Sequence, residues 1–175
     1  MAKRPVRSRD HVGRLVAKRR RETPDVPLDG MEIFGRARRL TSLSRPPIEA
    51  VFARHGIDAG EFDVLASLRR SGAPFALRPT ELYRELMISS GGLTARLNRL
   101  ERRGLIVREL SQADRRSATA RLTSSGLALI DQAYAEDMSL EAAMLAVLTL
   151  SERRTLANLL AKLLADMERS ADDNA

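Results

Sequence analysis

SSGGLTARLNRLERRGLIVRELSQADRRSATARLTSSG, residues 89–126, is the stretch of the chain that decides the fold. Its first half carries leucines at helical spacing and ends in a typical helix stop, in the order Leu93, Leu97, Leu100 and Gly104. LIVREL (105–110) and SATARL (117–122) then predict two short strands on either side of the turn SQADRR. A helix followed directly by a β-hairpin is therefore expected.

A second helix is predicted just before this stretch, in RPTELYRELMI. Pro79 suits a first helical turn, Glu81 follows it, and the helix should end near Met87. After a short turn, Ser89 or Ser90 would cap the next helix. Two short helices joined by a tight turn and followed by a hairpin predict a winged helix-turn-helix within a mostly α fold, with the hairpin as the wing.

The second of these helices has two different sides. At 100° per residue, Gly104 falls with the leucines on the buried side, and the opposite side comprises Ser90, Gly91, Thr94, Ala95, Asn98, Arg99 and Arg102. Its small first residues would let the helix enter the major groove of double-stranded DNA, Asn98 and Arg99 could pair with base edges, and Arg102 would lie near the backbone. A solvated helix face is the alternative. Arg96 is turned half inward, where an arginine requires a carboxylate or an anion.

Positive charge is concentrated at the N-terminus. Residues 1–21 contain nine lysines and arginines against Asp10, a net charge of +8 in a chain whose total is +7. A second basic region, residues 84–116, has eight arginines against four acids, whereas residues 131–175 have four bases against nine acids. Such basic regions are typical of proteins with a polyanion partner, most simply nucleic acid. The N-terminal segment has no clear apolar face, although DHVGRLVAKRRR could form a short helix.

The chain between this segment and the winged region predicts further helices. MEIFGRARRLTSL has apolar residues at every third position. Pro46 and Pro47 should then break or sharply kink the chain between residues 43 and 48, with Ser44 capping a new helix that ends at Gly56. GEFDVLASLRRSG predicts another short amphipathic helix.

Two long helices are expected at the C-terminus. Thr123 should cap the first, over residues 126–148, and Thr149 and Glu152 have capping-box spacing for the second. An apolar stripe runs along the last helix, made of Leu156, Leu159, Leu160, Leu163, Leu164 and Met167. Burial in the chain's own core would explain the stripe, but we favour packing against a second subunit.

Several classes of protein are disfavoured. The chain has no cysteine, and its two histidines, His11 and His55, lie far apart in the sequence, so we expect no metal and no cofactor. No nucleophile and base stand at a recognisable spacing, and no phosphate-binding glycine loop occurs, so we expect no catalytic residues and no enzyme. No run approaches the roughly 18 apolar residues of a membrane span, and MAKRPVRSRD lacks the apolar segment of a secretory signal. A cytoplasmic protein without membrane contact is expected.

The span from Gly60 to Ile130 resembles the multiple antibiotic resistance regulator (MarR) family of winged-helix transcription factors. The most specific motif is the wing signature of that family, which reads Asp114-Arg115-Arg116, five further residues, Leu122-Thr123 and Gly126. The helices predicted on both sides agree with the family's dimerisation region. The resemblance therefore covers most of the chain, and the basic first residues lie outside it.

The resemblance implies roles for the wing. A wing tip approaches the minor groove, whose narrow A·T-rich stretches attract arginine through their negative potential. Arg116 would be the inserted residue, Asp114 would orient it, and Arg115 would contact phosphate. A charged hairpin tip that contacts only water is the alternative.

The resemblance also implies a ligand. MISSGGLTARLNRLE together with an added N-terminal helix looks most like the branch that includes urate-responsive regulators, which bind small aromatic anions through a tryptophan, an aspartate and arginines. Asp63 and Arg96 match that set by position. The tryptophan does not, because the chain has none and the matching region reads VAKRRRETPD. Asp63 has the alternative of an exposed residue on the helix face of Ser67 and Arg70.

These observations predict a basic extension (1–21) and one MarR-like domain (22–175), with a winged core at 60–126 and dimerisation helices at 30–57 and 127–170. The expected function is that of a homodimeric, ligand-responsive repressor of a pseudo-palindromic operator. The alternative is a constitutive or architectural DNA binder whose basic tail supplies most of the affinity. A preference of roughly 10³ for one site over random duplex would separate the two.

Overall fold

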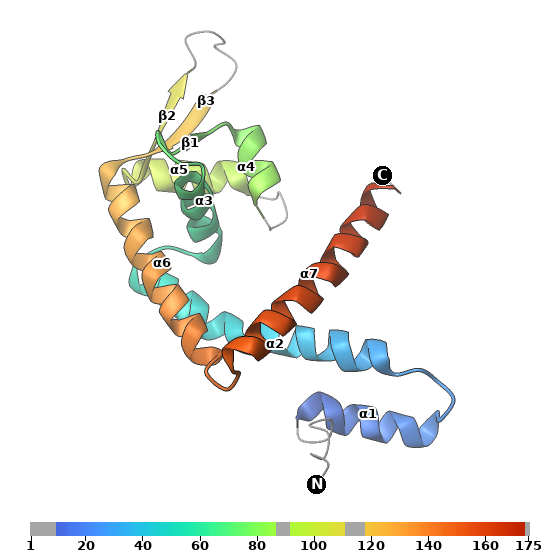
Figure 1. The fold of residues 1–175 in the computed structure, drawn as a ribbon. Helices are drawn as coiled ribbons and strands as arrows, with labels where there is room; N and C mark the ends of the chain where they lie inside the picture. The colour runs from blue at the N-terminus through green and yellow to red at the C-terminus, as the bar shows by residue number, and fades with distance from the viewer. Residues whose placement is uncertain (1–9, 87–91, 111–117, 174–175) are drawn as a thin grey trace. The chain divides into compact units, whose positions relative to one another are not determined.

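A computed structural model describes residues 10–86, 92–110 and 118–173 (Figure 1). Its elements are α1 (His11–Glu22), α2 (Asp29–Arg54), α3 (Ala59–Arg70), β1 (Ala76–Leu77), α4 (Pro79–Glu85), α5 (Leu93–Arg102), β2 (Ile106–Leu110), β3 (Ala118–Leu122), α6 (Ser124–Met144) and α7 (Leu150–Asp172). The chain divides into two units, one up to Ala59 and one from Gly60. The expected mostly helical fold is confirmed. Within the described ranges, every helix is too short or too polar to span a membrane.

In the first unit, α1 packs against the N-terminal part of α2. Val12 and Val16 lie one turn apart on α1 and are buried in a small cluster with Leu28, and Met31 packs against the same cluster. A short helix in this region is therefore confirmed. The expectation that the basic segment 1–21 has no apolar face is wrong, because two valines at i and i+4 are enough to form one.

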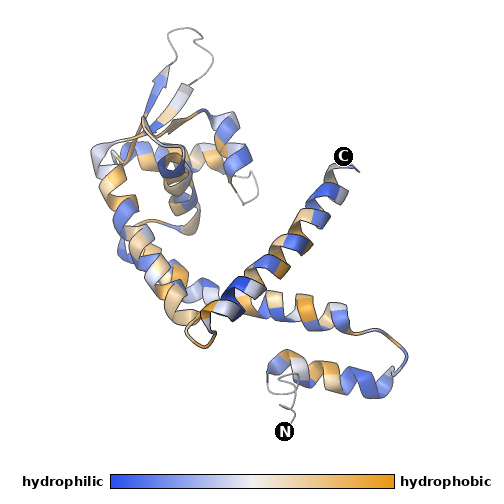
Figure 2. Ribbon diagram, in the orientation of Figure 1, coloured by the Kyte–Doolittle hydropathy of each residue, from blue (hydrophilic) through white to orange (hydrophobic). Residues whose placement is uncertain are grey.

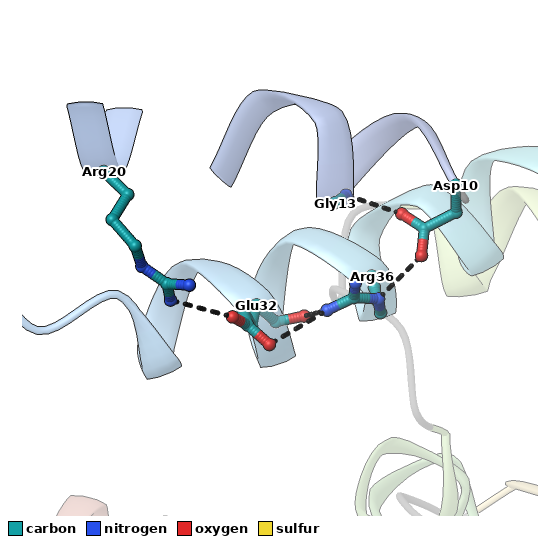
Figure 3. Close-up of polar contacts among 5 residues, drawn as sticks. All are labelled: Asp10, Gly13, Arg20, Glu32 and Arg36. Carbon is teal, nitrogen blue, oxygen red and sulfur yellow. Dashed lines mark hydrogen bonds and ion pairs between the residues drawn. The ribbon is translucent and has the colours of Figure 1, made fainter. Parts of the chain in front are cut away.

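A chain of alternating charges also joins the two helices (Figure 3). Arg36 on α2 donates from Nε to Oδ2 of Asp10 (3.0 Å), and its Nη1 lies 3.6 Å from Oε2 of Glu32. Glu32 in turn accepts a hydrogen bond from Arg20 on α1 (3.3 Å). The amide of Gly13, which donates to Asp10 at 2.7 Å, and the guanidinium of Arg36 hold the pKa of Asp10 below its usual value against the opposing effect of burial. Partly exposed pairs of this kind stabilise weakly, so the buried valines supply most of the attachment.

Helix α2 continues through Pro46 and Pro47, so the predicted break at this point is wrong. The prolines deprive the carbonyls of Ser42 and Leu43 of their usual amide donors. Both residues are exposed, so water can satisfy these carbonyls and the helix need not end. Ser44 does not cap a new helix; its hydroxyl donates to the carbonyl three residues earlier (3.4 Å).

In the second unit, α4 and α5 form the predicted pair of short helices. Pro79 is the first residue of α4, and α4 ends at Glu85. The N-cap residue of α5 is not a serine but Gly92, whose φ of 111° favours glycine. The predicted serine cap is therefore wrong, and Ser89 and Ser90 themselves lie outside the described residues.

Helix α5 ends at Arg102, and the predicted glycine stop, Gly104, follows its C-cap residue with a φ of 66°. The amide of Gly104 donates to the carbonyl of Glu101 (2.8 Å) and the amide of Leu105 donates to the carbonyl of Leu100 (3.0 Å), the two bonds of a Schellman motif. Gly104 is exposed, so its predicted place on the buried side of the helix is wrong. The largest fully buried side chains of the second unit include Leu65, Leu68, Leu82, Leu93, Leu100 and Ile106.

The predicted hairpin is confirmed as the antiparallel pair β2 and β3 (Figure 1). Ile106 pairs with Leu122 at its base and Leu110 with Ala118 at its far end. A third strand, β1, was not predicted because it has only two residues and no alternation of side chains. It pairs with β3, with Ala76 opposite Arg121, and gives the sheet order β1-β3-β2.

The two C-terminal helices begin as predicted. The Thr123 side chain caps α6, and Thr149 and Glu152 form a capping box at the start of α7. Helix α6 ends at Met144, four residues earlier than expected. Apolar segments recur along α7 (Figure 2), and its predicted stripe is exposed, from Leu163 at 39% to Leu159 at 61%. The stripe is therefore not buried in the core of this chain.

The first turn of α6 lies very close to the end of α5. Thr123 donates its hydroxyl to the carbonyl of Gly104 (2.7 Å), and its amide donates to the carbonyl of Leu105 (3.1 Å). Gly126, one turn into α6, has no side chain at the point of closest approach. A Cβ there would lie 1.9 Å from the carbonyl oxygen of Leu105, a distance that no non-bonded pair of atoms adopts.

We predict that Gly126→Ala lowers the free energy of unfolding by about 2 to 4 kcal/mol, because backbone must move to admit the methyl group. Chemical denaturation followed by circular dichroism measures it. Gly30→Ala is the matched control, since Gly30 lies in α2 with open space around it and should leave stability unchanged or raise it by up to about 1 kcal/mol. Equal effects of the two substitutions would contradict the close approach.

Candidate nucleic-acid interface

The described part of α5 has one buried and one accessible side. Its buried side is formed by Leu93, Leu97 and Leu100, as the angular prediction requires. The accessible side holds predicted DNA-facing residues, with Thr94, Ala95 and Arg102 exposed and Asn98 and Arg99 half-buried. Ser90 and Gly91, which were predicted to extend this side, lie outside the described residues.

Arginines of α5 meet a buried carboxylate at the start of α3. Glu61 is 5% exposed, although it is charged. Arg99 donates from Nε to its Oε1 (2.8 Å), and Nη1 of Arg103 lies 3.6 Å from its Oε2. A buried carboxylate is costly unless it is paired and hydrogen-bonded, so these contacts hold α5 against α3.

Sequence reasoning missed both Glu61 and Arg103. A signal was present, because Arg99 and Arg103 are four residues apart and therefore share one side of α5. Glu61 stands between Gly60 and Phe62 in the first turn of a short helix, where an acidic residue is expected on helix-dipole grounds alone. Nothing in the sequence distinguishes that ordinary role from pairing with another helix.

Arg96 is half-buried, as predicted, and its guanidinium lies against Gly60 of α3. A Cβ at Gly60 would be 2.3 Å from Cζ of Arg96, so the missing side chain of the glycine provides the space that the guanidinium occupies. Asp63 is half-buried and lies one turn further along α3 on the same face as Gly60. The two predicted ligand-binding residues thus belong to adjoining helix surfaces of the same unit.

Ion pairs also tie the hairpin strands to α5 and to each other. Arg108 on β2 donates from Nε to Glu101 on α5 (2.8 Å), and Arg121 on β3 donates to Glu109 on β2. These hydrogen bonds hold the pKa of Glu101 and that of Glu109 below their usual values. The wing tip that these strands carry, with Asp114, Arg115 and Arg116, lies outside the described residues.

The second unit therefore places a short helix, a second helix with one accessible polar side and an antiparallel hairpin one after another along the chain. This succession defines a winged helix-turn-helix protein. Among the residues that the structure describes, no three His, Asp or Glu side chains form a group that could hold a metal ion.

Comparison with known proteins agrees with this class. A model of the MarR family matches residues 55–117. The chain is 36% identical over 151 residues to the HTH-type transcriptional regulator PecS of Dickeya dadantii. The aligned residues cover 86% of this chain and 91% of that protein. It is 31% identical over 128 residues to an HTH-type transcriptional repressor of Mycobacterium bovis, covering 73% of this chain and 90% of the relative.

Solved structures show the same likeness. A mutant MarR from E. coli in complex with operator DNA superposes with a TM-score of 0.66 at 28% identity, covering 79% of this chain and 99% of that one. The chain belongs to the MarR family.

Proposed function

We propose that this protein is a transcriptional repressor that binds a pseudo-palindromic DNA operator as a homodimer and responds to a small ligand. The observation that carries the proposal is the accessible side of α5, which is small at its start and polar beyond it, beside a hairpin wing. The relatives support it, since PecS is named as a transcriptional regulator and the E. coli MarR structure contains operator DNA. We expect the protein to act in the cytoplasm.

The roles proposed for single residues follow from their positions. Thr94 and Ala95 keep the first turn of α5 thin enough to enter a major groove. Ser90 and Gly91, which precede α5 in the sequence, are proposed to contact the DNA with them. Asn98 and Arg99 are the candidates for base edges and Arg102 the candidate for phosphate. In the wing, Arg116 would enter the minor groove with Asp114 as its partner and Arg115 on phosphate.

Homodimerisation is proposed from exposed apolar surface. The stripe on α7 and a second set on α2, comprising Ile33, Phe34, Leu40 and Leu43, are all at least 39% exposed. Each set is a run of exposed large apolar side chains along one helix, a feature that in a soluble protein is typical of an interaction surface. A two-fold dimer would also match the symmetry of a palindromic operator.

The ligand is proposed to be a small aromatic or otherwise anionic molecule near Arg96 and Asp63. A half-buried guanidinium is the feature that favours an anion. A ligand at this position would contact both α3 and α5, so its binding could alter how α5 is presented to DNA. The absence of tryptophan separates this chain from the urate-binding pattern, and the chemical class is therefore proposed more broadly than urate.

Two substitutions test DNA reading. Asn98→Ala should relax the preference at one base position per half-site by about 1 to 3 kcal/mol, because alanine cannot form the bidentate hydrogen bonds to a base. Arg116→Ala should weaken operator binding by about 1 to 3 kcal/mol while the protein stays folded. Competition gel shifts with single-base variants of a duplex selected by the wild-type protein measure both effects.

Arg102→Gln is the matched control for Asn98→Ala, since the removal of a charge that faces phosphate weakens binding to all sequences alike. If Asn98→Ala weakened binding to all duplex sequences equally, Asn98 would be a contact to the DNA backbone instead. Unchanged affinity with Arg116→Ala would remove the wing from the mechanism.

The basic face of α1 is predicted to add sequence-independent affinity. Lys18, Arg19 and Arg21 are exposed, whereas Val16 is buried. If the three bases neutralise phosphates, the substitution of all three by Gln should lower the slope of log affinity against log salt by about 0.9 for each phosphate that is no longer neutralised.

Removing residues 1–21 should lower the same salt slope by several units per dimer and preserve operator preference.

Val16→Ala separates charge from packing in this test, because it loosens α1 without changing its charge. It should lower thermal stability and leave the salt slope unchanged. Equal slopes for the wild-type protein and the triple Gln variant would exclude α1 as a DNA-binding element.

The exposed stripe on α7 is predicted to form part of the dimer interface. Leu160→Glu with Leu164→Glu should shift the protein towards monomer in analytical ultracentrifugation, because two carboxylates cannot be buried in an apolar interface. Lys162→Glu is the control, since it makes the same change in net charge on the polar side of α7. A double variant that remains as dimeric as the control would place the interface elsewhere.

A further inference from the structure

We infer that Glu61 is a positioning residue that determines how much of the positive charge of α5 is available to DNA, and that it thereby raises the preference of the protein for its operator over random duplex. The inference rests on the proposed DNA-binding function. It concerns a carboxylate on α3 that would not itself touch DNA. Its effect would be exerted through Arg99 on α5 and Arg103, the C-cap residue of α5, which both pair with it.

Three arginines, two on α5 and one at its C-cap, form a stripe that faces the first turn of α3. Arg96, Arg99 and Arg103 are at positions i, i+3 and i+7, so they lie within about 60° of one another around the helix. The first lies against Gly60, and the other two pair with Glu61. Two neighbouring residues of α3 thus receive three guanidiniums.

The two arginines could exchange Glu61 for a phosphate as their partner. The side chain of Glu61 is only 6% exposed, whereas those of Arg99 and Arg103 are 40% and 37% exposed. The carboxylate is therefore shielded from solvent, whereas both guanidiniums are partly accessible to it. A phosphate oxygen that approached from the solvent side would compete with Glu61 for the same donors.

Competition of this kind affects the two types of DNA binding differently. Binding to random duplex depends almost entirely on the neutralisation of phosphates and the counterions that this releases. A guanidinium that is paired with Glu61 contributes less to binding of random duplex than one that is available to the DNA backbone. Base reading depends on the orientation of α5 and of the Arg99 side chain, both of which the same ion pairs stabilise. Glu61 should therefore weaken non-specific binding more than operator binding.

The test is the salt dependence of binding for Glu61→Gln, which keeps the shape of the side chain and removes its charge. The probes are a duplex selected from a random library by the wild-type protein and a duplex of scrambled sequence, both measured by fluorescence anisotropy at several potassium chloride concentrations. We expect tighter binding to the scrambled duplex and a salt slope steeper by about 0.9 for each additional phosphate neutralised, up to about 2 per protomer. The ratio of the two affinities should fall severalfold.

Asp131→Asn is the matched control. It changes the net charge equally and releases another arginine, Arg69, from a pair on α3 and α6 (2.7 Å) that does not involve α5. If Glu61→Gln and Asp131→Asn give the same slope and the same affinity ratio, the inference is overturned. In a background of Arg99→Gln with Arg103→Gln, the substitution of Glu61 should have no further effect on the slope.

Glu61→Asp provides a second route, because it keeps the net charge and withdraws the carboxylate by one methylene. It should shift the slope in the same direction by a smaller amount, and an unchanged slope in a folded Glu61→Asp protein would contradict the inference even if Glu61→Gln failed to fold. The proposed function fails separately, if the wild-type protein shows no preference between the selected and the scrambled duplex.

Discussion

The close approach of the first turn of α6 to the carbonyl of Leu105 is the constraint on which the winged unit depends. Thr123 directly follows β3, caps α6 by accepting the amide of Gly126 and donates its hydroxyl to the carbonyl of Gly104, so one residue joins β3, α6 and the end of α5. Glycine is required where α6 touches the end of α5. The orientation of α5 follows, because its far end is held at this corner and its leucines are held by the core.

Ion pairs distribute charge around this corner in a consistent way. Glu61 joins α5 to α3, Glu101 joins α5 to β2, and Glu109 joins β2 to β3. Each of these carboxylates pairs with at least one arginine of the winged unit. The arginines of this unit are therefore of two kinds, some engaged within the protein and some, such as Arg102, exposed on the proposed DNA-binding side of α5.

Much of this fold could be predicted from the sequence, because its signals are local. The leucine spacing of α5, the glycine stop and the capping box at Thr149 depend on residues within one or two turns of each other. The predicted break at Pro46 was wrong because the cost of a proline depends on whether solvent reaches the freed carbonyls, which is a property of the fold.

The candidate site was predictable to a smaller extent. The sequence placed Thr94, Asn98 and Arg102 on the accessible side of α5, and the structure has them there. The pairing of Glu61 with Arg99 links residues 38 positions apart, and no periodicity reports a pairing over that length. The hydroxyl of Thr123 could be predicted to cap α6, but its second bond, across 19 positions to Gly104, could not.

Operator recognition by α5 and the wing is tested most directly by the set of genomic DNA fragments that the purified full-length protein retains at physiological salt, followed by footprinting of those fragments. We predict a small number of fragments, each protected over two inverted half-sites whose centres are about 10 base pairs, or one helical turn, apart. Retention in proportion to fragment length, with no protected sequence in common, would contradict the proposal that α5 and the wing read an operator.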